Sequence, residues 1–424
     1  MNIIFLTLSR VDNITNRDIY TDLMRKFHNE GHQVYIVSPS ERRMGLKTSL
    51  MEYEGVHILN VWTLNIQKTN ILEKGIGTLV LEHQYRHAIR KYLKGVKFDL
   101  ILYSTPPITF TNVVTCLKQK NPEAVSYLLL KDIFPQNAID IGLFSKKSFI
   151  YHYFRHKEKA LYKASDYIGC MSPANVEYLH LHNRFYQKWR IEVAPNSIEL
   201  RDERLRVGEL SSGMGREVRD RNAIREKYGL PTDKPVFIYG GNLGKPQGID
   251  YLIRCLDDNK YRKDCFFLIV GSGTEYHRLA SWLEEQERVK DDTRSMSVKL
   301  MKGLPKEEYD QLVQSCDVGL IFLDYRFTIP NYPSRLLSYL ENKMPVICAT
   351  DVNTDIGRIA EQNGYGYWCQ SINPLHFSVL VNRFLAEPER IKTMGERGYK
   401  YLMMHYLVDH TYQVIMNHFK TKTE

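Results

Sequence analysis

The chain has 424 residues, of which 43% are hydrophobic and 25% are charged, a globular composition with material for two or three domains. No apolar run approaches the roughly 18 residues that a membrane-spanning helix needs. The formal net charge of +9 is compatible with nucleic acid, an acidic membrane surface or phosphorylated ligands, and by itself it favours none of them.

The first half of the chain alternates predicted strands and helices. Residues 2–8 are a continuous apolar run, which is typical of a strand covered on both faces. Residues 16–30 then carry apolar side chains at helical spacing, and residues 33–38 form the next expected strand. This strand–helix–strand order predicts a parallel sheet. Further strands are predicted at 56–62, 98–103, 126–130, 167–171 and 191–194.

The second half repeats this alternation after a break. Residues 201–221 are charged and contain SSGMG, which indicates a linker or an exposed loop. Strands are then predicted at 236–239, 266–270, 298–300, 318–323 and 346–349, and the tail from about residue 388 is expected to be helical. The chain therefore has the pattern of two successive Rossmann-like halves, and ligands of such sheets bind beyond the carboxyl ends of the strands.

The N-terminal residues and the cysteines bear on the compartment. MNIIFLTLSR lacks a basic leader and a small-residue cleavage site, so a strand is expected there and not a signal peptide. The seven cysteines are scattered and include no CxxC pair. Such a set favours buried thiols in a reducing cytosol over disulfides or a zinc site.

Residues 328–346, TIPNYPSRLLSYLENKMPV, predict a loop that leads into a short helix and stops before a strand. Pro330 and Pro333 exclude regular structure at the start and leave Ser334 at the helix N-terminus. Free N–H groups at a helix N-terminus, together with the cation of Arg335, would suit a diphosphate. The alternative is an ordinary connection with a surface arginine.

Residues 239–250, YGGNLGKPQGID, place a glycine-rich loop between a strand and a helix. Glycines let a backbone approach phosphate and Lys245 supplies charge, although neither a P-loop nor a GxGxxG fingerprint is present. Two later strand ends also carry small residues, in LIVGSGTE at 268–275 and in GLP at 303–305. We expect these turns to converge with residues 328–335 in a nucleotide site; the alternative is turns that bind nothing.

Several segments together resemble glycosyltransferase family 4, whose members have the GT-B fold. In the second half they are VFIYGGNLGKPQGIDYL, FLIVGSGTE, KGLPKEEYDQLVQSCDVGLI and PSRLLSYLENKMPVI, in the order of the family's donor-domain motifs. In the first half, LKDIFPQNAIDIG resembles the RDLWP segment of the capsule and O-antigen branch, and VAPNSIE resembles the family's IPNGVD hinge. The resemblance implies an acceptor domain at 1–200, a donor domain at 201–395, an interdomain cleft, and a helix at 396–424 that crosses back to the first domain.

The resemblance also implies a donor site. Lys245 and Arg335, with backbone amides at 240–244 and 333–335, would stabilise charge on the leaving diphosphate. The other donor contacts would be Gly240, Gly241, Asn242, Gly244, Gln247, Gly271, Gly273, Leu304, Pro333, Ser334, Ser338 and Glu341.

This chain departs from the family pattern in two of the donor-domain motifs. Asn242 and Gln247 stand where many members have arginine and lysine, and Pro330 and Ser338 replace the paired glutamates of an E-x7-E motif. Glu341 would either reach the ribose in place of the second glutamate or be a solvated surface charge.

In the first half, Asp132 is the expected catalytic residue, because it follows the strand at 126–130 and the resemblance places it facing the donor. It would orient the acceptor hydroxyl or accept its proton, whereas the alternative is that it caps the turn before Pro135. Asn13, Asn16 and Arg17 would contact the acceptor or a phosphate, or would serve only as turn and N-cap residues.

Two stretches suggest a membrane surface. Residues 82–97 place Tyr85, Ile89 and Leu93 on one helical side beside the cations Arg86, Arg90, Lys91 and Lys94. The range Lys146–Lys163 mixes aromatic residues with lysine and arginine. The alternative is two solvated helix faces whose aromatic residues pack inward.

The expected function is that of a hexosyl-type glycosyltransferase, moving sugar from a UDP-sugar to a lipid-linked (polyprenyl diphosphate) glycan in bacterial capsule or O-antigen synthesis, with retention implied by the resemblance. No cofactor, no metal and no nucleic acid are expected, and the protein would be cytoplasmic and peripheral at the inner face of the membrane. The alternatives are a GT-B sugar-nucleotide epimerase and a non-catalytic homologue that binds a partner transferase.

Overall fold

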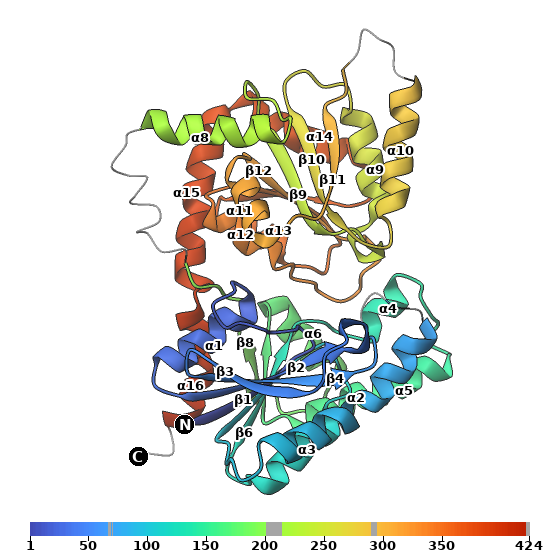
Figure 1. Cartoon of the computed structure of the whole chain (residues 1–424). Helices are drawn as coiled ribbons and strands as arrows, with labels where there is room; N and C mark the ends of the chain where they lie inside the picture. The colour runs from blue at the N-terminus through green and yellow to red at the C-terminus, as the bar shows by residue number, and fades with distance from the viewer. Residues whose placement is uncertain (67–68, 70, 201–213, 290–294, 421–424) are drawn as a thin grey trace. The chain divides into compact units, whose positions relative to one another are not determined.

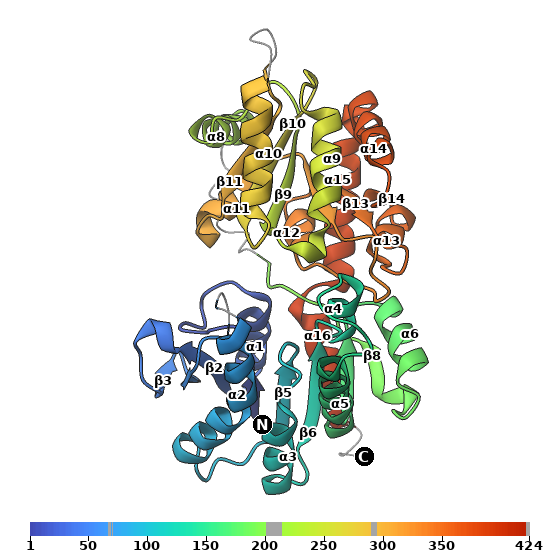
Figure 2. The ribbon, with the colours of Figure 1, turned by 90° about the vertical axis from the view of Figure 1, so that its right-hand side faces the viewer.

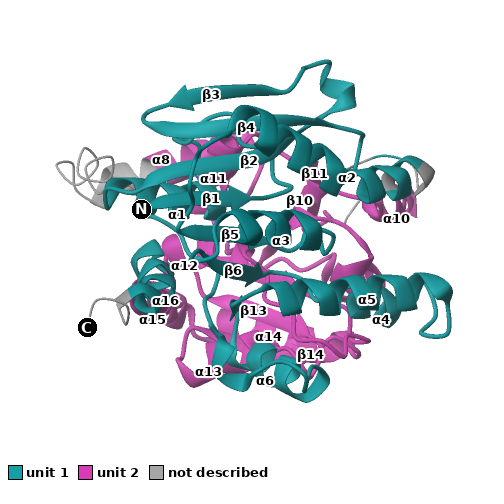
Figure 3. Ribbon diagram, turned by 90° about the horizontal axis from the view of Figure 1, so that it is seen from below, with its two compact units in different colours: residues 1–199, 407–424 teal, residues 200–406 magenta. Residues whose placement is uncertain are grey.

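The computed structural model describes residues 1–66, 69, 71–200, 214–289 and 295–420 (Figure 1). The chain forms two compact units, which Figure 3 shows in different colours. Unit 1 comprises Met1–Glu199 with Leu407–Glu424, and unit 2 comprises Leu200–Tyr406.

Unit 1 is built on an eight-stranded sheet of order β3-β4-β2-β1-β5-β6-β7-β8. All its pairs are parallel except β3 with β4. The strands are β1 (Asn2–Leu6), β2 (Gln33–Glu41), β3 (Ser49–Tyr53), β4 (Val56–Thr63), β5 (Leu100–Ser104), β6 (Val125–Leu130), β7 (Tyr167–Cys170) and β8 (Ile191–Val193). The helices are α1 (Ile19–Asn29), α2 (Ile71–Tyr92), α3 (Thr111–Lys120), α4 (Gln136–Asp140), α5 (Phe149–Ala164), α6 (Pro173–His182) and α16 (Val408–Lys420), with 3-10 turns η1 (Arg42–Met44) and η2 (Lys188–Arg190).

The core of unit 1 explains why its central strands are apolar throughout. Helices α1 and α16 pack on the sheet face that carries Ile3 and Phe5, and the edge of the Tyr412 ring meets Phe27 at a centroid distance of 5.0 Å. Helices α2, α3 and α5 pack side by side, as Figure 2 shows. Strands with helices on both faces have no solvent-exposed side. Their sequences therefore lack the alternation of apolar and polar residues that half-exposed strands show.

Unit 2 is built on a six-stranded, fully parallel sheet of order β11-β10-β9-β12-β13-β14. Its strands are β9 (Val236–Asn242), β10 (Phe266–Ser272), β11 (Val298–Lys302), β12 (Val318–Phe322), β13 (Val346–Thr350) and β14 (Gly366–Gln370). Its helices are α8 (Met214–Lys227), α9 (Ile249–Asn259), α10 (Tyr276–Val289), α11 (Lys306–Gln314), α12 (Arg335–Glu341), α13 (Ile356–Gln362), α14 (Pro374–Ala386) and α15 (Pro388–His405), with the 3-10 turn η3 (Lys245–Gln247).

The predicted α/β class with parallel sheets is confirmed. The linker prediction is wrong from residue 214 onward, where α8 begins, while residues 201–213 lie outside the described residues. The chain passes between units at 199–200 and again at 406–407, between α15 and α16. All seven cysteines are free thiols, and each is buried except Cys116, which is half-buried.

Candidate functional site

Three strand ends meet at the carboxyl edge of the unit 2 sheet. Gly271 at the end of β10 lies opposite both Gly241 of β9 and Lys302 of β11. A Cβ atom at Gly271 would collide with the carbonyl oxygen of Gly241, and one at Gly273 would collide with that of Leu243. Gly271 and Gly273 thus allow the β9 turn to lie directly on the β10 turn.

The β11 turn joins the same edge. A Cβ atom at Gly303 would lie 3.8 Å from Ser272 Oγ, so this turn rests on the end of β10. Leu304 follows it and is half-buried before α11 begins. The three glycine-bearing turns therefore form one continuous backbone surface.

The β9 turn is held by its own polar side chains. Gln247 Oε1 accepts hydrogen bonds from Gly244 N at 3.1 Å and from Asn242 Nδ2 at 3.2 Å, and Tyr239 donates its hydroxyl to Asn242 O at 2.7 Å. Asn242 and Lys245 are exposed. The amide oxygen of Gln247 thus shapes the loop, while Lys245 remains open to solvent.

Arg335 lies against this turn from the start of α12. Its guanidinium carbon is 4.2 Å from the centroid of the Tyr239 ring, and a Cβ atom at Gly241 would be 3.4 Å from it. Arg335 Nη1 is buried and has no hydrogen-bond partner among the described residues. An unsatisfied buried donor costs about 1–3 kcal/mol, so an acceptor group at this position would stabilise the folded state.

Two further tyrosines complete the surroundings of Arg335, and the sequence did not point to them. Tyr339, four residues along α12, accepts a hydrogen bond from Gly240 N at 3.1 Å. The Tyr309 hydroxyl occupies the space that a Cβ atom of Gly240 would need. The one available signal was the spacing of Tyr339 from Arg335, which places both on one side of a helix.

The other predicted residues of α12 differ in exposure. Ser334 is exposed and its side chain caps nothing, and Pro333 before it is half-buried. Ser338 Oγ is buried without a hydrogen-bond partner among the described residues. Glu341 is 3% exposed, so the alternative of a solvated surface charge is wrong.

Asp132 lies in unit 1, directly after β6. Lys131 N and Asp132 N donate to Thr105 Oγ1 at 3.0 and 3.2 Å, which fixes the strand end, and Asp132 Oδ1 accepts from Asn137 Nδ2 at 2.6 Å. Burial raises the pKa of Asp132 to about 6 and lowers the pKa of Lys131 to about 7. Two groups that titrate near neutral pH therefore adjoin each other at a strand end, a common property of functional sites.

Asn13, Asn16 and Arg17 all make hydrogen bonds within unit 1. Asn13 Oδ1 accepts from Thr15 N at 2.7 Å, which closes a turn. The carbonyl of Asn16 accepts from Thr21 Oγ1, and Arg17 Nη2 donates to Glu199 O. The N-cap of α1 is Asp18, which accepts from Tyr20 N at 2.9 Å. These contacts favour the turn interpretation of the first two residues over substrate binding.

The two basic stretches differ in what they expose. On α2 and directly after it, Tyr85, Ile89 and Leu93 are buried, whereas Arg86, Arg90, Lys91 and Lys94 are exposed. The expected apolar membrane side of residues 82–97 is therefore wrong, because those side chains belong to the core. Around the start of α5, by contrast, Phe149 is 83% exposed and Ile150 is 51% exposed, beside the exposed Lys146 and Lys147.

The described part of the chain has neither a cluster of metal-ligating side chains nor a membrane-spanning helix. No three His, Cys, Asp or Glu side chains in it gather closely enough to hold a metal ion. No helix there combines the length and apolar character that crossing a membrane requires.

Comparison with known proteins agrees with the geometry of unit 2. Residues 220–401 match the family described as glycosyl transferases group 1. The chain is 21% identical over 324 residues to the protein named glycosyltransferase WbjE of Pseudomonas aeruginosa, covering 74% of this chain and 72% of that protein. It is 24% identical over 145 residues to the protein named colanic acid biosynthesis glycosyl transferase WcaI of Escherichia coli K12, covering 34% and 33% of the two chains.

Solved structures share the fold over the whole chain. Sucrose-phosphate synthase from Thermosynechococcus elongatus superposes with a TM-score of 0.72 at 14% identity, covering 99% of each chain. HepE of Anabaena, solved in complex with UDP, superposes with a TM-score of 0.67 at 12% identity, covering 99% of this chain and 100% of HepE. The fold is thus GT-B, and the chain is a glycosyltransferase with a group 1 domain at residues 220–401.

Proposed function

We propose that this enzyme transfers a hexosyl residue from a UDP-sugar to a hydroxyl of a lipid-linked glycan during bacterial surface polysaccharide synthesis. The single observation that carries the donor half of this proposal is the buried Nη1 of Arg335 beside Gly241, which has no partner in the described part of the chain. A diphosphate oxygen is the acceptor that this cation and the neighbouring backbone amides would suit. HepE, which shares the fold, was solved with UDP, and this supports the choice of nucleotide.

In this proposal Arg335, Lys245 and the amides of 240–244 stabilise the negative charge that grows on UDP as the glycosidic bond breaks. Ser338 Oγ, to which no described residue forms a hydrogen bond, would bond a ribose hydroxyl, with Glu341 on the same helix, in place of the family's two glutamates. Charge stabilisation is thus assigned to protein groups, and the transfer rate is expected to be unchanged by a metal chelator. Retention of configuration follows from the resemblance alone.

Asp132 would orient the acceptor hydroxyl or take its proton. A carboxyl group with a pKa of about 6 is largely ionised at neutral pH and can still accept a proton. The relatives WbjE and WcaI carry names of bacterial glycosyltransferases, and WcaI is named for colanic acid biosynthesis, which supports a polysaccharide acceptor in the capsule or O-antigen class.

The lipid-linked acceptor would be reached by peripheral association with the inner face of the cell membrane. Support comes from the α5 region, where Phe149 and Ile150 are exposed beside Lys146 and Lys147. Exposed aromatic and aliphatic groups next to lysines favour an anionic bilayer surface. The exposed cations of α2 would add electrostatic attraction without inserting.

The test is a transfer assay with the purified full chain, a panel of UDP-sugars and a polyprenyl diphosphate-linked glycan, with UDP release and product mass as readouts. One UDP-sugar is expected to give a lipid-linked product larger by one sugar, and Asp132→Ala is expected to lower the rate about 100-fold or more. Epimerisation of the donor without acceptor would replace the proposal by an epimerase. Failure to bind any nucleotide would replace it by a non-catalytic partner protein.

A further inference from the structure

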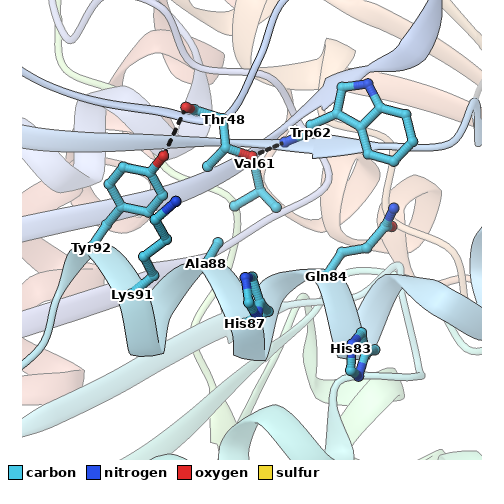
Figure 4. Close-up of a pocket in the computed structure, with 9 residues that line it drawn as sticks. All are labelled: Thr48, Val61, Trp62, His83, Gln84, His87, Ala88, Lys91 and Tyr92. Carbon is cyan, nitrogen blue, oxygen red and sulfur yellow. Dashed lines mark hydrogen bonds between the residues drawn. The ribbon is translucent and has the colours of Figure 1, made fainter.

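Unit 1 contains a cavity of about 340 Å³ between strand β4 and the second half of α2 (Figure 4). The strand contributes Val61 and Trp62, and residue Thr48 before β3 closes one side. Neither Asp132 nor any of the donor-site residues of unit 2 lines it. The cavity is therefore separate from the site described above.

Trp62 provides an aromatic wall of the cavity. Trp62 is 39% exposed, and its backbone N donates a hydrogen bond to Thr48 Oγ1 at 2.9 Å. Tyr92 of α2 donates its hydroxyl to Thr48 O at 3.2 Å, so helix and strand are joined across one end of the cavity. An exposed indole presents a flat apolar surface, and the C–H groups of a pyranose ring pack well on such a surface.

Gln84 supplies an unsatisfied polar group on the other side. Figure 4 shows its side chain rising from α2 toward Trp62. Its Oε1 atom is buried and has no hydrogen-bond partner among the described residues. A carboxamide can accept at oxygen and donate at nitrogen, which matches a pair of neighbouring sugar hydroxyls.

The charge at the cavity is positive. Lys91 is exposed, and its ammonium lies 5.2 Å from the centroid of the Tyr92 ring. His83 and His87 are also exposed, with ring centroids 6.5 Å apart on the same side of α2, and both can bond oxygen ligands. None of the described residues that line the cavity is Asp or Glu. A carboxylate on the ligand would therefore meet a cation and no opposing acid.

We propose that this cavity binds a negatively charged sugar residue of a glycan, a uronic acid, with its ring against Trp62, its hydroxyls on Gln84 and its carboxylate near Lys91. The binding requires neither donor nor transfer. It is therefore independent of the proposed function, and a failed transfer assay would not affect its test.

The test uses 19F NMR of the full chain labelled with 5-fluorotryptophan, because the protein has only four tryptophans. The Trp62 signal is assigned by its loss in Trp62→Phe. The ligand is the methyl glycoside of glucuronate. Titration with it to about 50 mM covers the millimolar affinities typical of weak sites. A saturable shift of the Trp62 signal is expected, while methyl glucoside should bind several-fold more weakly. The signal of Trp189, which is 64% exposed beside Arg190, is the matched control and should not move.

Variants separate the assigned contacts. Gln84→Leu should weaken uronate binding about tenfold, the effect of losing one or two hydrogen bonds. Lys91→Met should remove the preference for uronate over glucoside. The proposal is overturned if the Trp62 signal does not saturate, if inorganic phosphate shifts it as strongly as uronate does, or if anionic vesicles shift it and uronate does not.

Discussion

The guanidinium of Arg335 stacks 4.2 Å from the Tyr239 ring centroid, which places a cation from the start of α12 at the end of strand β9. A cation–π contact uses the face of the ring and leaves N–H groups of the guanidinium for another partner. Because Nη1 has no such partner among the described residues, this pair of residues defines where an anionic group would bind.

Arg335→Met should lower the transfer rate about 100- to 1,000-fold, because the charge growing on the leaving group loses its closest cation. Arg335→Lys should recover part of that loss, since a lysine supplies charge without the planar fork. The matched control is Arg254→Met, because Arg254 also stacks on a tyrosine of unit 2, at 5.7 Å from the Tyr251 ring centroid. Equal rates for Arg335→Met and Arg254→Met would contradict the assignment.

Gly240→Ala should destabilise unit 2 by about 1–3 kcal/mol, since its Cβ atom would collide with the Tyr309 hydroxyl. Combining it with Tyr309→Ala should make the two changes non-additive, because the second removes the colliding ring. Urea unfolding of the wild type, both single variants and the double variant measures this coupling. Simple addition of the two free-energy changes would mean that the contact is not formed.

Replacing Asp132 and replacing Lys131 should each raise the melting temperature, with opposite dependence on pH. Burial raises the pKa of Asp132 from 3.8, the value in the unfolded chain, to about 6 in the folded protein. The free energy that the buried carboxylate costs the folded state is therefore absent below pH 3.8 and complete above pH 6. Asp132→Asn should therefore raise the melting temperature more at pH 8 than at pH 4. An isosteric amide can still accept the hydrogen bond from Asn137.

Lys131 shows the reverse behaviour, since burial lowers its pKa from 10.5 to about 7. The free energy that the buried ammonium costs the folded state is complete below pH 7 and disappears as the pH rises toward 10.5, the pKa in the unfolded chain. Lys131→Met should thus raise the melting temperature more at pH 6 than at pH 10. The same trend with pH for both variants would show that at least one of the two pKa shifts is absent.

Phe149→Ser combined with Ile150→Ser should reduce sedimentation with anionic liposomes at least severalfold, because two exposed apolar groups no longer enter the interface. Leu375→Ser is the control, since Leu375 of α14 is an apolar side chain that is 62% exposed but lies in unit 2. Neutralising Arg86, Arg90, Lys91 and Lys94 should act mainly at low salt, as expected for a purely electrostatic contribution. Sedimentation that survives all these changes would remove both surfaces from the proposal.

The sheet and its turns were predictable because their causes are local. A parallel strand between two helical layers must be apolar on both faces, and Ile3–Leu6 show this directly. Gly271 and Gly273 marked a turn because a side chain there would strike a neighbouring carbonyl. By contrast, the strand β3 escaped prediction, since as an edge strand it is largely exposed and lacks a continuous apolar run.

The surroundings of Arg335 and the face of α2 depended on tertiary packing. Nothing near Tyr309 in sequence indicates that its hydroxyl lies over Gly240, because α11 is brought there only by the order of strands β11, β10 and β9. Likewise, periodicity identified Tyr85, Ile89 and Leu93 as one side of a helix, but it could not tell whether a sheet or a membrane covers that side.

The most direct test of a donor site at Arg335 is a thermal-shift measurement of the wild type and Arg335→Met with UDP and a panel of UDP-sugars. A ligand at about 100 times its dissociation constant stabilises the folded state by about 2.7 kcal/mol. The wild type should be stabilised by UDP and by one UDP-sugar, and Arg335→Met should lose most of that shift while keeping its own melting temperature near that of the wild type. A wild type that no uridine nucleotide stabilises, or an Arg335→Met variant that is stabilised equally, would contradict the proposed site.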